Sequence, residues 1–568
     1  MSSISIHHPT SRSAVINLLR RLHFYIGLFV APFIFVAALT GTIYVLTPQI
    51  ENVLYADALT VQPQGVAKPL SEQINAARLY AGETMKVYAV RPAPGASDTT
   101  RVQFADPNLG PSESRSVFID PYTLQVRGDM TVYGTSGVLP LRMWLDQLHQ
   151  GLLLGDVGRN YSELAASWLW VAALGGVVLW LSTRPRRKAN KVSGKLAITR
   201  HWHVTLGLIL VAGLVFFSVT GLTWSQWAGN NIDKMRSDLG WLTPQVNTVL
   251  NGTAPDVPTD PHAEHKGAMD GMNMSGMTMP AMASSPRKAA TINYPNADWD
   301  SVLNSARSAG ISATKIELRQ PKAADKAWTV TEVDRSWPTQ VDAVSVNPND
   351  FSIVDHIWFD KFPLVAKLTR WGVDAHMGVL FGLPNQLILA AFGLGLCMMI
   401  VLGYRMWWIR RPKLAETHSA RTLLAAWLTM PTAGKLIAAV VALALGYALP
   451  VMGISLLAFL LIDILRWKRQ GNRHVIDARL TTESVNISLR TRKTRQFITA
   501  VVVVLLIILA IMTKAMIGGA IDEYHIPLNH WSAEMLVTQI FMIVVYSSVF
   551  TGLLSVPLWY WFLGEEEL

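Results

Sequence analysis

Hydrophobic residues run in long unbroken stretches that alternate with polar segments along this chain. Eight stretches are apolar enough to be helices in a hydrocarbon layer of about 30 Å. They lie near residues 24–46, 164–182, 204–224, 385–409, 434–449, 451–466, 496–516 and 535–562. Pro450 separates the fifth from the sixth, and each of these two is short for a full crossing. The pattern predicts an α-helical integral membrane protein with about eight transmembrane helices.

Two polar segments show the alternating pattern of β-strands instead. "SVFIDPYTLQVRGDM" (116–130) and "AVSVNPNDFSIVDHI" (343–357) each read as a strand, an Asp-Pro or Asn-Pro turn and a second strand. A helix-like stretch precedes each, "LSEQINAARLYAG" in the first half and "WDSVLNSARSAG" in the second. This order predicts two small α+β modules, one in each half of the chain.

The distribution of Lys and Arg predicts the orientation. The connection 184–200 holds seven basic residues and no acidic one, and the connection 466–495 holds nine against two. Cytoplasmic loops carry such an excess, so both connections and both termini are expected in the cytoplasm. The segments 51–160 and 228–380 then lie outside, in the periplasm of a bacterial inner membrane. The net charge of +10 reflects this topology, and no nucleic acid partner is expected.

These patterns predict a division into eight parts. A cytoplasmic amino terminus with the first span comes first, and a four-helix membrane region comes last. The predicted boundaries are 1–50 for the first span, 51–160 for the first periplasmic module, 161–183 for the second span, 184–203 for the basic loop, 204–227 for the third span, 228–383 for the second periplasmic region, 384–412 for the fourth span and 413–568 for the carboxyl-terminal region.

Histidines recur at matched positions in the two halves. In the first and third spans, a His is followed by Gly four residues later and by Thr-Gly after thirteen more. The matched positions are His23, Gly27 and Gly41 in one span and His203, Gly207 and Gly221 in the other. A second match joins "HQGLLLG", which begins at His149, to "HMGVLFG", which begins at His376. The chain is therefore predicted to contain parallel repeats.

Helical geometry gives this spacing a meaning. At 100° per residue, His23, Gly27 and Gly41 share one face of a continuous α-helix, and the same holds in the matched span. His23 and His203 begin parallel spans at the cytoplasmic face, whereas His149 and His376 precede spans at the external face. Close helix packing around small residues would also produce such glycines. Because the histidines are duplicated, two His pairs are expected, one per membrane face.

Paired imidazoles beside glycine are typical of b-type haem sites, because imidazole is an axial ligand and glycine leaves room for the porphyrin. The inner haem is predicted at His23 and His203 beside Gly27 and Gly207, and the outer haem at His149 and His376 beside Gly41 and Gly221. His201 is a rival to His203, but the repeat register favours His203.

The "RLHxxxGL…TG" spans, the paired external modules and the "HxGxLxG" approaches resemble the PepSY-associated transmembrane family, which includes siderophore reductases of the inner membrane. The resemblance covers roughly residues 15–412. It implies that the family's haem-ligand role falls on the four matched histidines. Leu124 stands where such modules often carry Gly after the turn.

One segment belongs to neither repeat. The stretch 262–282 contains six of the 21 methionines in a Gly/Ser/Pro-rich setting that is typical of a flexible external loop. Thioether and imidazole ligands suit copper, so a transient copper site is one interpretation and a plain linker is the other. The predicted ligands are His262, His265, Met269, Met272, Met274, Met277, Met279 and Met282.

No dinucleotide-binding, ATP-binding or HExxH zinc motif is present. Electrons are therefore expected from membrane quinol or from a cytoplasmic reductase. The predicted function is a di-haem oxidoreductase that passes electrons across the membrane to a periplasmic ferric siderophore or a similar metal complex. Two alternatives stay open: a copper-binding cupric reductase, and a non-enzymatic membrane protein whose modules bind a partner.

Overall fold

The computed structural model describes residues 11–110, 112–134, 137–183, 194–250, 294–410, 423–477, 483–524 and 527–562. The chain divides into two units. The helical unit comprises Met1–Thr42, Gln147–Ile232 and Ala390–Leu568, and the sheet unit comprises Ile43–Asp146 and Asp233–Leu389.

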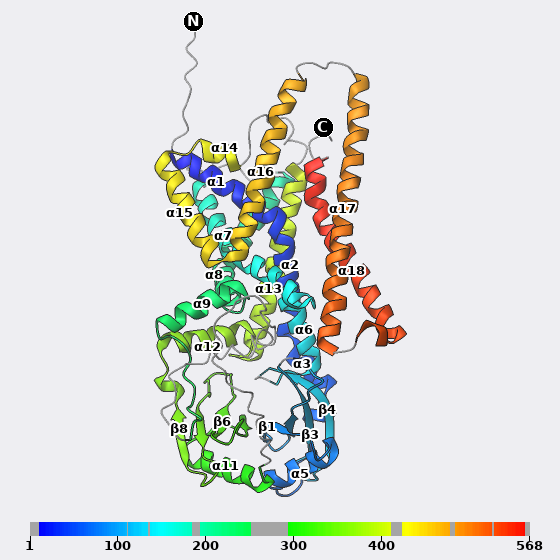
Figure 1. Cartoon of the computed structure of the whole chain (residues 1–568). Coiled ribbons are helices and arrows are strands. Elements are labelled where there is room, and N and C mark those ends of the chain that lie inside the picture. The colour runs from blue at the N-terminus through cyan, green and yellow to red at the C-terminus, as the bar shows by residue number, and fades with distance from the viewer. Residues whose placement is uncertain are drawn as a thin grey trace, which may run out of the picture. The chain divides into compact units, whose positions relative to one another are not determined.

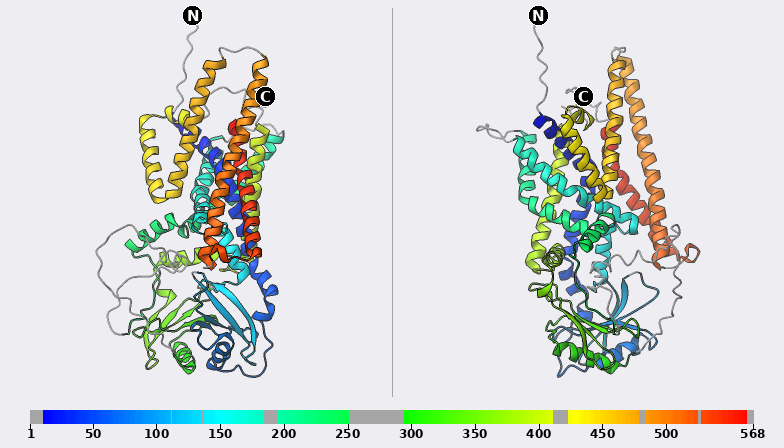
Figure 2. Two further views of the ribbon diagram at one scale, coloured as in Figure 1. Left: turned by 45° about the vertical axis from the view of Figure 1, so that its right-hand side comes forward. Right: turned by 60° about the vertical axis from the view of Figure 1, so that its left-hand side comes forward.

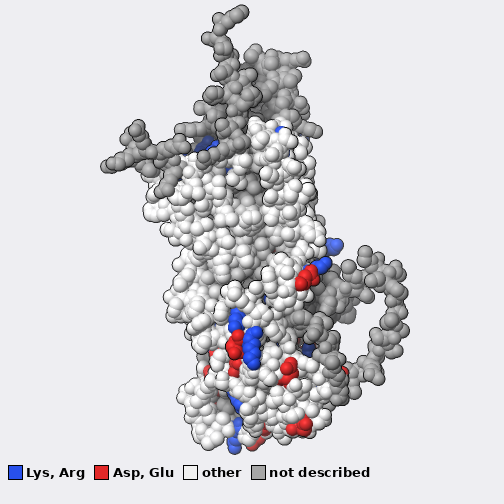
Figure 3. Space-filling view, turned by 90° about the vertical axis from the view of Figure 1, so that its left-hand side faces the viewer, with Lys and Arg blue, Asp and Glu red and all other residues white. Residues whose placement is uncertain are grey.

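Long apolar helices build the helical unit (Figure 1). The helices that lie wholly or partly in it are α1 (Ser11–Tyr25), a π-helical turn η1 (Ile26–Val30), α2 (Ala31–Val45), α6 (Pro140–Gly151), α7 (Gly155–Thr183), α8 (Lys195–Thr223), α9 (Trp227–Asp238), α13 (Leu383–Arg410), α14 (Leu423–Leu428), α15 (Thr432–Ala448), α16 (Pro450–Asp477), α17 (Glu483–Tyr524), the 3₁₀ turn η4 (Leu528–His530) and α18 (Ala533–Phe562). On the face drawn in Figure 3, this unit presents a broad band without Lys, Arg, Asp or Glu.

Six helices of the described residues are long and apolar enough to cross a membrane, fewer than the predicted eight. They are Ala14–Val45, Gly155–Thr183, Lys195–Thr223, Leu383–Arg410, Thr494–Gly518 and Met535–Gly552. The expected fifth and sixth spans correspond to the shorter apolar helices Thr432–Ala448 and Pro450–Leu465. At 1.5 Å per residue, the apolar part of neither helix reaches the roughly 30 Å of a hydrocarbon core. The chain is a multi-pass membrane protein with six candidate spans, and the prediction of eight also counted two helices whose apolar parts are shorter than these.

The first span is interrupted by the π turn η1, which separates α1 from α2. A single π turn is equivalent to one residue inserted into an α-helix, and one residue rotates the downstream part of the helix by about 100°. His23 lies before this turn and Gly41 lies after it. The two residues therefore do not share one continuous helical face, as a regular helix would require.

The sheet unit contains two α+β halves. Its helices are α3 (Thr47–Leu54), α4 (Ala56–Leu59), α5 (Leu70–Ala81), α11 (Asn296–Ser308), the 3₁₀ turn η2 (Phe359–Lys361) and α12 (Leu364–His376). Its strands are β1 (Val87–Arg91), β2 (Thr100–Phe104), β3 (Glu113–Ile119), β4 (Val126–Tyr133), β5 (Ile316–Arg319), β6 (Trp328–Glu332), β7 (Ala343–Val346) and β8 (Ile353–Ile357). The predicted helix and strand-turn-strand order is confirmed in both halves.

The two halves are not separate modules, which corrects the sequence-based expectation. They form one antiparallel eight-stranded sheet in the order β4-β3-β2-β1-β5-β6-β7-β8. Strand β1 pairs with β5, with Ala89 opposite Arg319 and Val90 opposite Leu318. Side chains of Arg91 and Arg319 both reach the buried Glu317 at 2.5 Å, so an ion-pair cluster lies at this seam.

A single apolar core supports both halves of the sheet. Helices α5 and α11 lie side by side against it (Figure 1). Backbone N–H groups of Leu70 and Ser71 donate to the carboxylate of Asp300, which caps the start of α5 from α11. In the core, the rings of Trp299 and Trp328 meet edge to face at 4.7 Å. Each half thus completes the hydrophobic core of the other.

The matched turns of the two halves share a backbone strain. Leu124 has φ +64° and Phe351 has φ +56°, which is the left-handed region that favours glycine. Leu124 stands 227 positions before Phe351, and His149 stands the same distance before His376. The offset of 227 residues between the two repeats is therefore the same at these turns and at the histidines that precede the next membrane helix.

Candidate functional site

His23 and His203 both lie in the helical unit. His23 lies near the end of α1 and His203 lies in the first half of α8. Their rings are close enough to interact electrostatically. Two other helices face these rings with glycine: a Cβ on Gly176 of α7 would lie 3.3 Å from Cε1 of His23, and a Cβ on Gly403 of α13 would lie 3.5 Å from Cε1 of His203. The predicted inner pair thus lies between two glycine-bearing helices.

Gly176 and Gly403 were not predicted from the sequence, although a signal for them exists. The repeat pattern pointed instead to Gly27 and Gly207, on the histidine-bearing helices themselves. A Cβ on Gly27 would meet no heavy atom within 4 Å, and one on Gly207 would contact the sulfur of Met399 at 3.4 Å. Gly403 follows Gly176 by 227 residues, the same offset that relates His376 to His149. Extending that register along the second and fourth spans would have identified both glycines.

The ring nitrogens of the inner pair have different surroundings. Nδ1 of His203 lies 2.9 Å from the carbonyl oxygen of Met399. Because a carbonyl only accepts, Nδ1–H donates and Nε2 keeps the lone pair that a metal needs. Nδ1 of His23 is buried and has no hydrogen-bond partner among the described residues. His201, the rival ligand, is exposed and packs its ring against Trp202 at 5.9 Å.

His149 lies at the end of α6, against the second half of the first span. A Cβ on Gly41 would lie 3.1 Å from Cε1 of His149, so the predicted neighbours meet. Nδ1 of His149 lies 3.0 Å from the Thr40 hydroxyl, which donates its own hydrogen to the Val36 carbonyl at 2.8 Å. In the tautomer that carries hydrogen on Nδ1, this nitrogen donates to the Thr40 hydroxyl and Nε2 has the lone pair.

Two further features hold His149 in this state. The hydroxyl of Tyr161 on α7 donates to the carbonyl oxygen of His149 at 2.5 Å. Burial lowers the pKa of His149 to about 4, against a smaller opposing effect of a hydrogen bond to the Ala37 carbonyl. The imidazole is therefore neutral near pH 7, which is the form that ligates iron.

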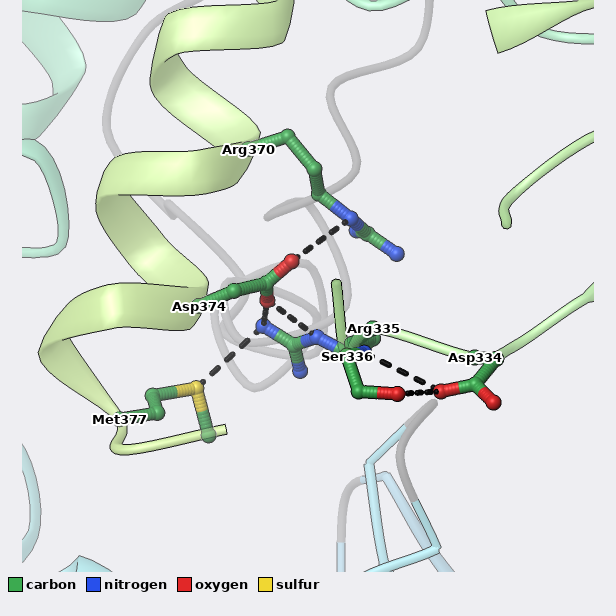
Figure 4. A network of polar contacts seen from close by, with 6 residues as sticks. All are labelled: Asp334, Arg335, Ser336, Arg370, Asp374 and Met377. Carbon is green, nitrogen blue, oxygen red and sulfur yellow. Dashed lines mark hydrogen bonds and ion pairs between the residues drawn. The ribbon is translucent and has the colours of Figure 1, made fainter. Parts of the chain in front are cut away.

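His376 is the last residue of α12 in the sheet unit, whereas His149 belongs to the helical unit. The buried carboxylate of Asp374, two residues earlier, pairs with Arg335 at 2.5 Å and with Nε of Arg370 at 3.5 Å (Figure 4). Arg335 also donates to the sulfur of Met377 at 3.4 Å (Figure 4). This network, which no sequence pattern predicted, fixes the end of α12 that carries His376.

The matched glycines after His149 and His376 have a clear backbone role. Gly155 has φ +55° and is the first residue of α7, and Gly382 has φ +59° and directly precedes α13. Gly221 is expected at the level of the outer haem, and a Cβ on it would lie 3.3 Å from Cβ of Ala166. The glycines of the "HxGxLxG" motif therefore shape the turn into the next span.

The expected copper loop lies outside the described residues, which include none of the eight ligands predicted between His262 and Met282. Within the part of the chain that the structure describes, no group of three or more His, Cys, Asp or Glu side chains is placed to hold a metal ion. The hypothesis of a copper site stays a prediction.

Two family models match this chain. The model described as PepSY-associated TM region matches residues 20–410, and the model described as protein of unknown function DUF2534 matches residues 487–566. A stretch of the chain is also similar to the uncharacterized protein YnaJ of Escherichia coli strain K12. The two are 46% identical over 79 residues, which make up 14% of this chain and 93% of YnaJ, and the same values hold for YnaJ of Escherichia coli O157:H7.

Proposed function

Because the chain belongs to the PepSY-associated TM region family, we propose that it is a di-haem b-type oxidoreductase of the bacterial inner membrane. The observation that carries the proposal is the glycine next to each ring of two histidines that interact electrostatically: Gly176 faces His23, and Gly403 faces His203. Two repeats thus contribute equivalent helices and equivalent glycines to one pair of imidazoles. A structural role for a single buried histidine would not require this duplication.

The residues present fit a haem at the inner pair. Nε2 of His203 is available for iron because Nδ1 is committed to the Met399 carbonyl. His23 offers a buried ring nitrogen without a hydrogen-bond partner among the described residues. Glycine next to each ring keeps side chains out of the space beside the imidazole. A haem bound there would supply one-electron transfer at a potential set by its ligands and their surroundings.

The second haem of the proposal has His149 and His376 as ligands, as the sequence repeat predicts. The Thr40 hydroxyl lies within hydrogen-bond distance of Nδ1 of His149, and burial keeps the ring neutral. The ion pairs of Asp374 fix the backbone that carries His376. The chain's own residues therefore prepare each predicted outer ligand within its own unit.

The proposed acceptor is a ferric siderophore or a similar periplasmic metal complex. Hard oxygen chelators hold Fe(III) more tightly than Fe(II), so one electron weakens the complex and releases the metal. Membrane quinol or a cytoplasmic reductase would supply the electron, since the sequence contains no dinucleotide-binding motif. His149 and His376 stand on the periplasmic side of the predicted topology, so the acceptor is expected to take its electron there.

Haem content and a reduced-minus-oxidised spectrum of the purified protein test the proposal. Native protein should contain about two b-type haems per chain. His203→Ala should reduce this to about one, whereas the matched His201→Ala variant should keep both, because His201 is exposed. Native protein without haem would refute the proposal.

The acceptor is tested on protein that has been chemically reduced in detergent. A ferric siderophore should reoxidise the native protein, and His149→Ala should slow this reaction far more than deletion of 262–282. The copper alternative predicts the reverse ranking, with Cu(II) accepting electrons only when the loop is present.

A further inference from the structure

Helices α17 and α18 form an antiparallel pair at the end of the chain (Figure 2). The region that is similar to YnaJ takes up 93% of that protein but only 14% of this chain. This stretch has almost the same length as the region 487–566 that matches DUF2534, so we infer that a sequence of the α17–α18 type exists in Escherichia coli as a protein of its own. In this chain, the same kind of helix pair follows a PepSY-associated region.

An apolar stripe on α17 is one of the contacts through which the helix pair packs against the rest of the helical unit. Ile508, Met512 and Met516 recur every four residues on α17, and all three are buried. Together with Ile543 of α18, they form one hydrophobic cluster with residues of the α6–α7 corner. The corner residues in this cluster are Leu152, Leu154 and Tyr161. The stripe therefore contacts a surface that is defined by residues outside the YnaJ-like part.

This surface lies beside the predicted outer haem ligand. Tyr161, which packs in the cluster, donates its hydroxyl to the carbonyl of His149. Val36 of α2 packs against the same cluster, and its carbonyl accepts from the Thr40 hydroxyl that binds His149. The helix pair thus covers two of the contacts that orient the His149 ring.

We propose that α2, α6 and α7 form a docking surface for a two-helix membrane subunit, which in this chain is fused as α17–α18. Docking is driven by the apolar stripe of α17 and holds the α6–α7 corner, so the pair acts as a positioning element for His149. The docking part of this inference is independent of haem, and the positioning part rests on the proposed function.

The docking part is tested on full-length protein with a protease site inserted between residues 477 and 483. After cleavage in mild detergent, the α17–α18 fragment should co-purify with a tag on the amino terminus. Ile508→Trp with Met512→Trp should reduce its recovery about tenfold, equivalent to about 1.4 kcal/mol, because overpacking disrupts the buried stripe.

Ile507→Trp with Ile511→Trp is the matched control. Ile507 is 54% exposed and Ile508 is 7% exposed, and both pairs have the same four-residue spacing and the same apolar replacement. The control fragment should be recovered like the native one. Separation of the native fragment after cleavage, or equal recovery of both double variants, would overturn the docking proposal.

The positioning part has its own readout in the uncleaved variants. The Ile508/Met512 variant should shift the midpoint potential or the low-spin spectrum of one haem, and the control variant should leave both haems as in the native protein. Unchanged signals with a lost fragment would overturn the positioning role alone. A protein without haem would refute the proposed function, while fragment recovery would still decide whether the helix pair docks.

Discussion

Replacing Gly41 with Ala should displace His149, and replacing Gly27 with Ala in the same membrane span should not. The new Cβ at Gly41 would lie 3.1 Å from Cε1 and 3.4 Å from Nδ1 of His149. Apolar carbons are at their best separation at about 3.5–4.0 Å. The imidazole must therefore move by a few tenths of an ångström or more. At Gly27, a new Cβ would meet nothing within 4 Å.

The expected energy follows from three contributions. Ala is favoured over Gly in a helix interior by about 0.8–1.0 kcal/mol, and this gain applies to both variants. Overpacking at Gly41 costs about 1–3 kcal/mol. Stretching the 3.0 Å contact between Nδ1 of His149 and the Thr40 hydroxyl loses up to about 1 kcal/mol more. Gly41→Ala should thus be less stable than Gly27→Ala by about 1–4 kcal/mol.

The assay compares thermal unfolding and the haem spectrum of the two variants with those of the native protein in one detergent. Gly27→Ala should unfold at the native temperature or above it. Gly41→Ala should unfold at a lower temperature and show an altered signal from one haem. If the two variants unfold alike and their spectra match, the close contact between Gly41 and His149 does not constrain the ligand, and the reasoning fails.

Two other predictions concern the framework around the site. Glu317→Gln should destabilise the seam between β1 and β5 by about 3–5 kcal/mol, because it leaves the buried Arg91 and Arg319 without their anion. Asp129→Asn, which removes an exposed ion pair, should cost at most about 1 kcal/mol. Burial alone would raise the pKa of Glu317, but Arg91 and Arg319 outweigh this effect and lower the pKa. The stabilisation by the Glu317 carboxylate is therefore present above its unfolded pKa near 4.5 and is lost as the pH falls through its folded pKa. Hydrogen exchange of the β1 and β5 amides as a function of pH checks both statements, and equal protection in the Glu317 and Asp129 variants would contradict them. Gly158→Ala should prevent stable folding because the new Cβ would overlap the carbonyl oxygen of Gly151. In the control variant Gly175→Ala on the same helix, the new Cβ would meet no heavy atom within 4 Å, so this variant should fold. Comparable yields of the two folded variants from membranes would show that the α6–α7 corner adapts and would contradict the prediction.

The sequence alone determined where the six long membrane helices lie and which strands flank the two matched turns. Those features depend on residue periodicity, which is local, so α7, α8 and α13 lie where the apolar stretches predicted them. The gap-free repeat also predicts His23 and His203 as a pair, because equivalent positions in parallel repeats are expected at equivalent depth.

Other features depended on contacts between segments far apart in the sequence. Pairing of β1 with β5 merged the two expected modules into one sheet, since each half leaves an edge strand and part of an apolar core for the other to cover. The π turn in the first span changed the rotation between His23 and Gly41, which the 100° rule could not anticipate. Gly176 and Gly403 contact the rings from neighbouring helices, and only helix packing decides which residue of one helix meets a side chain of another.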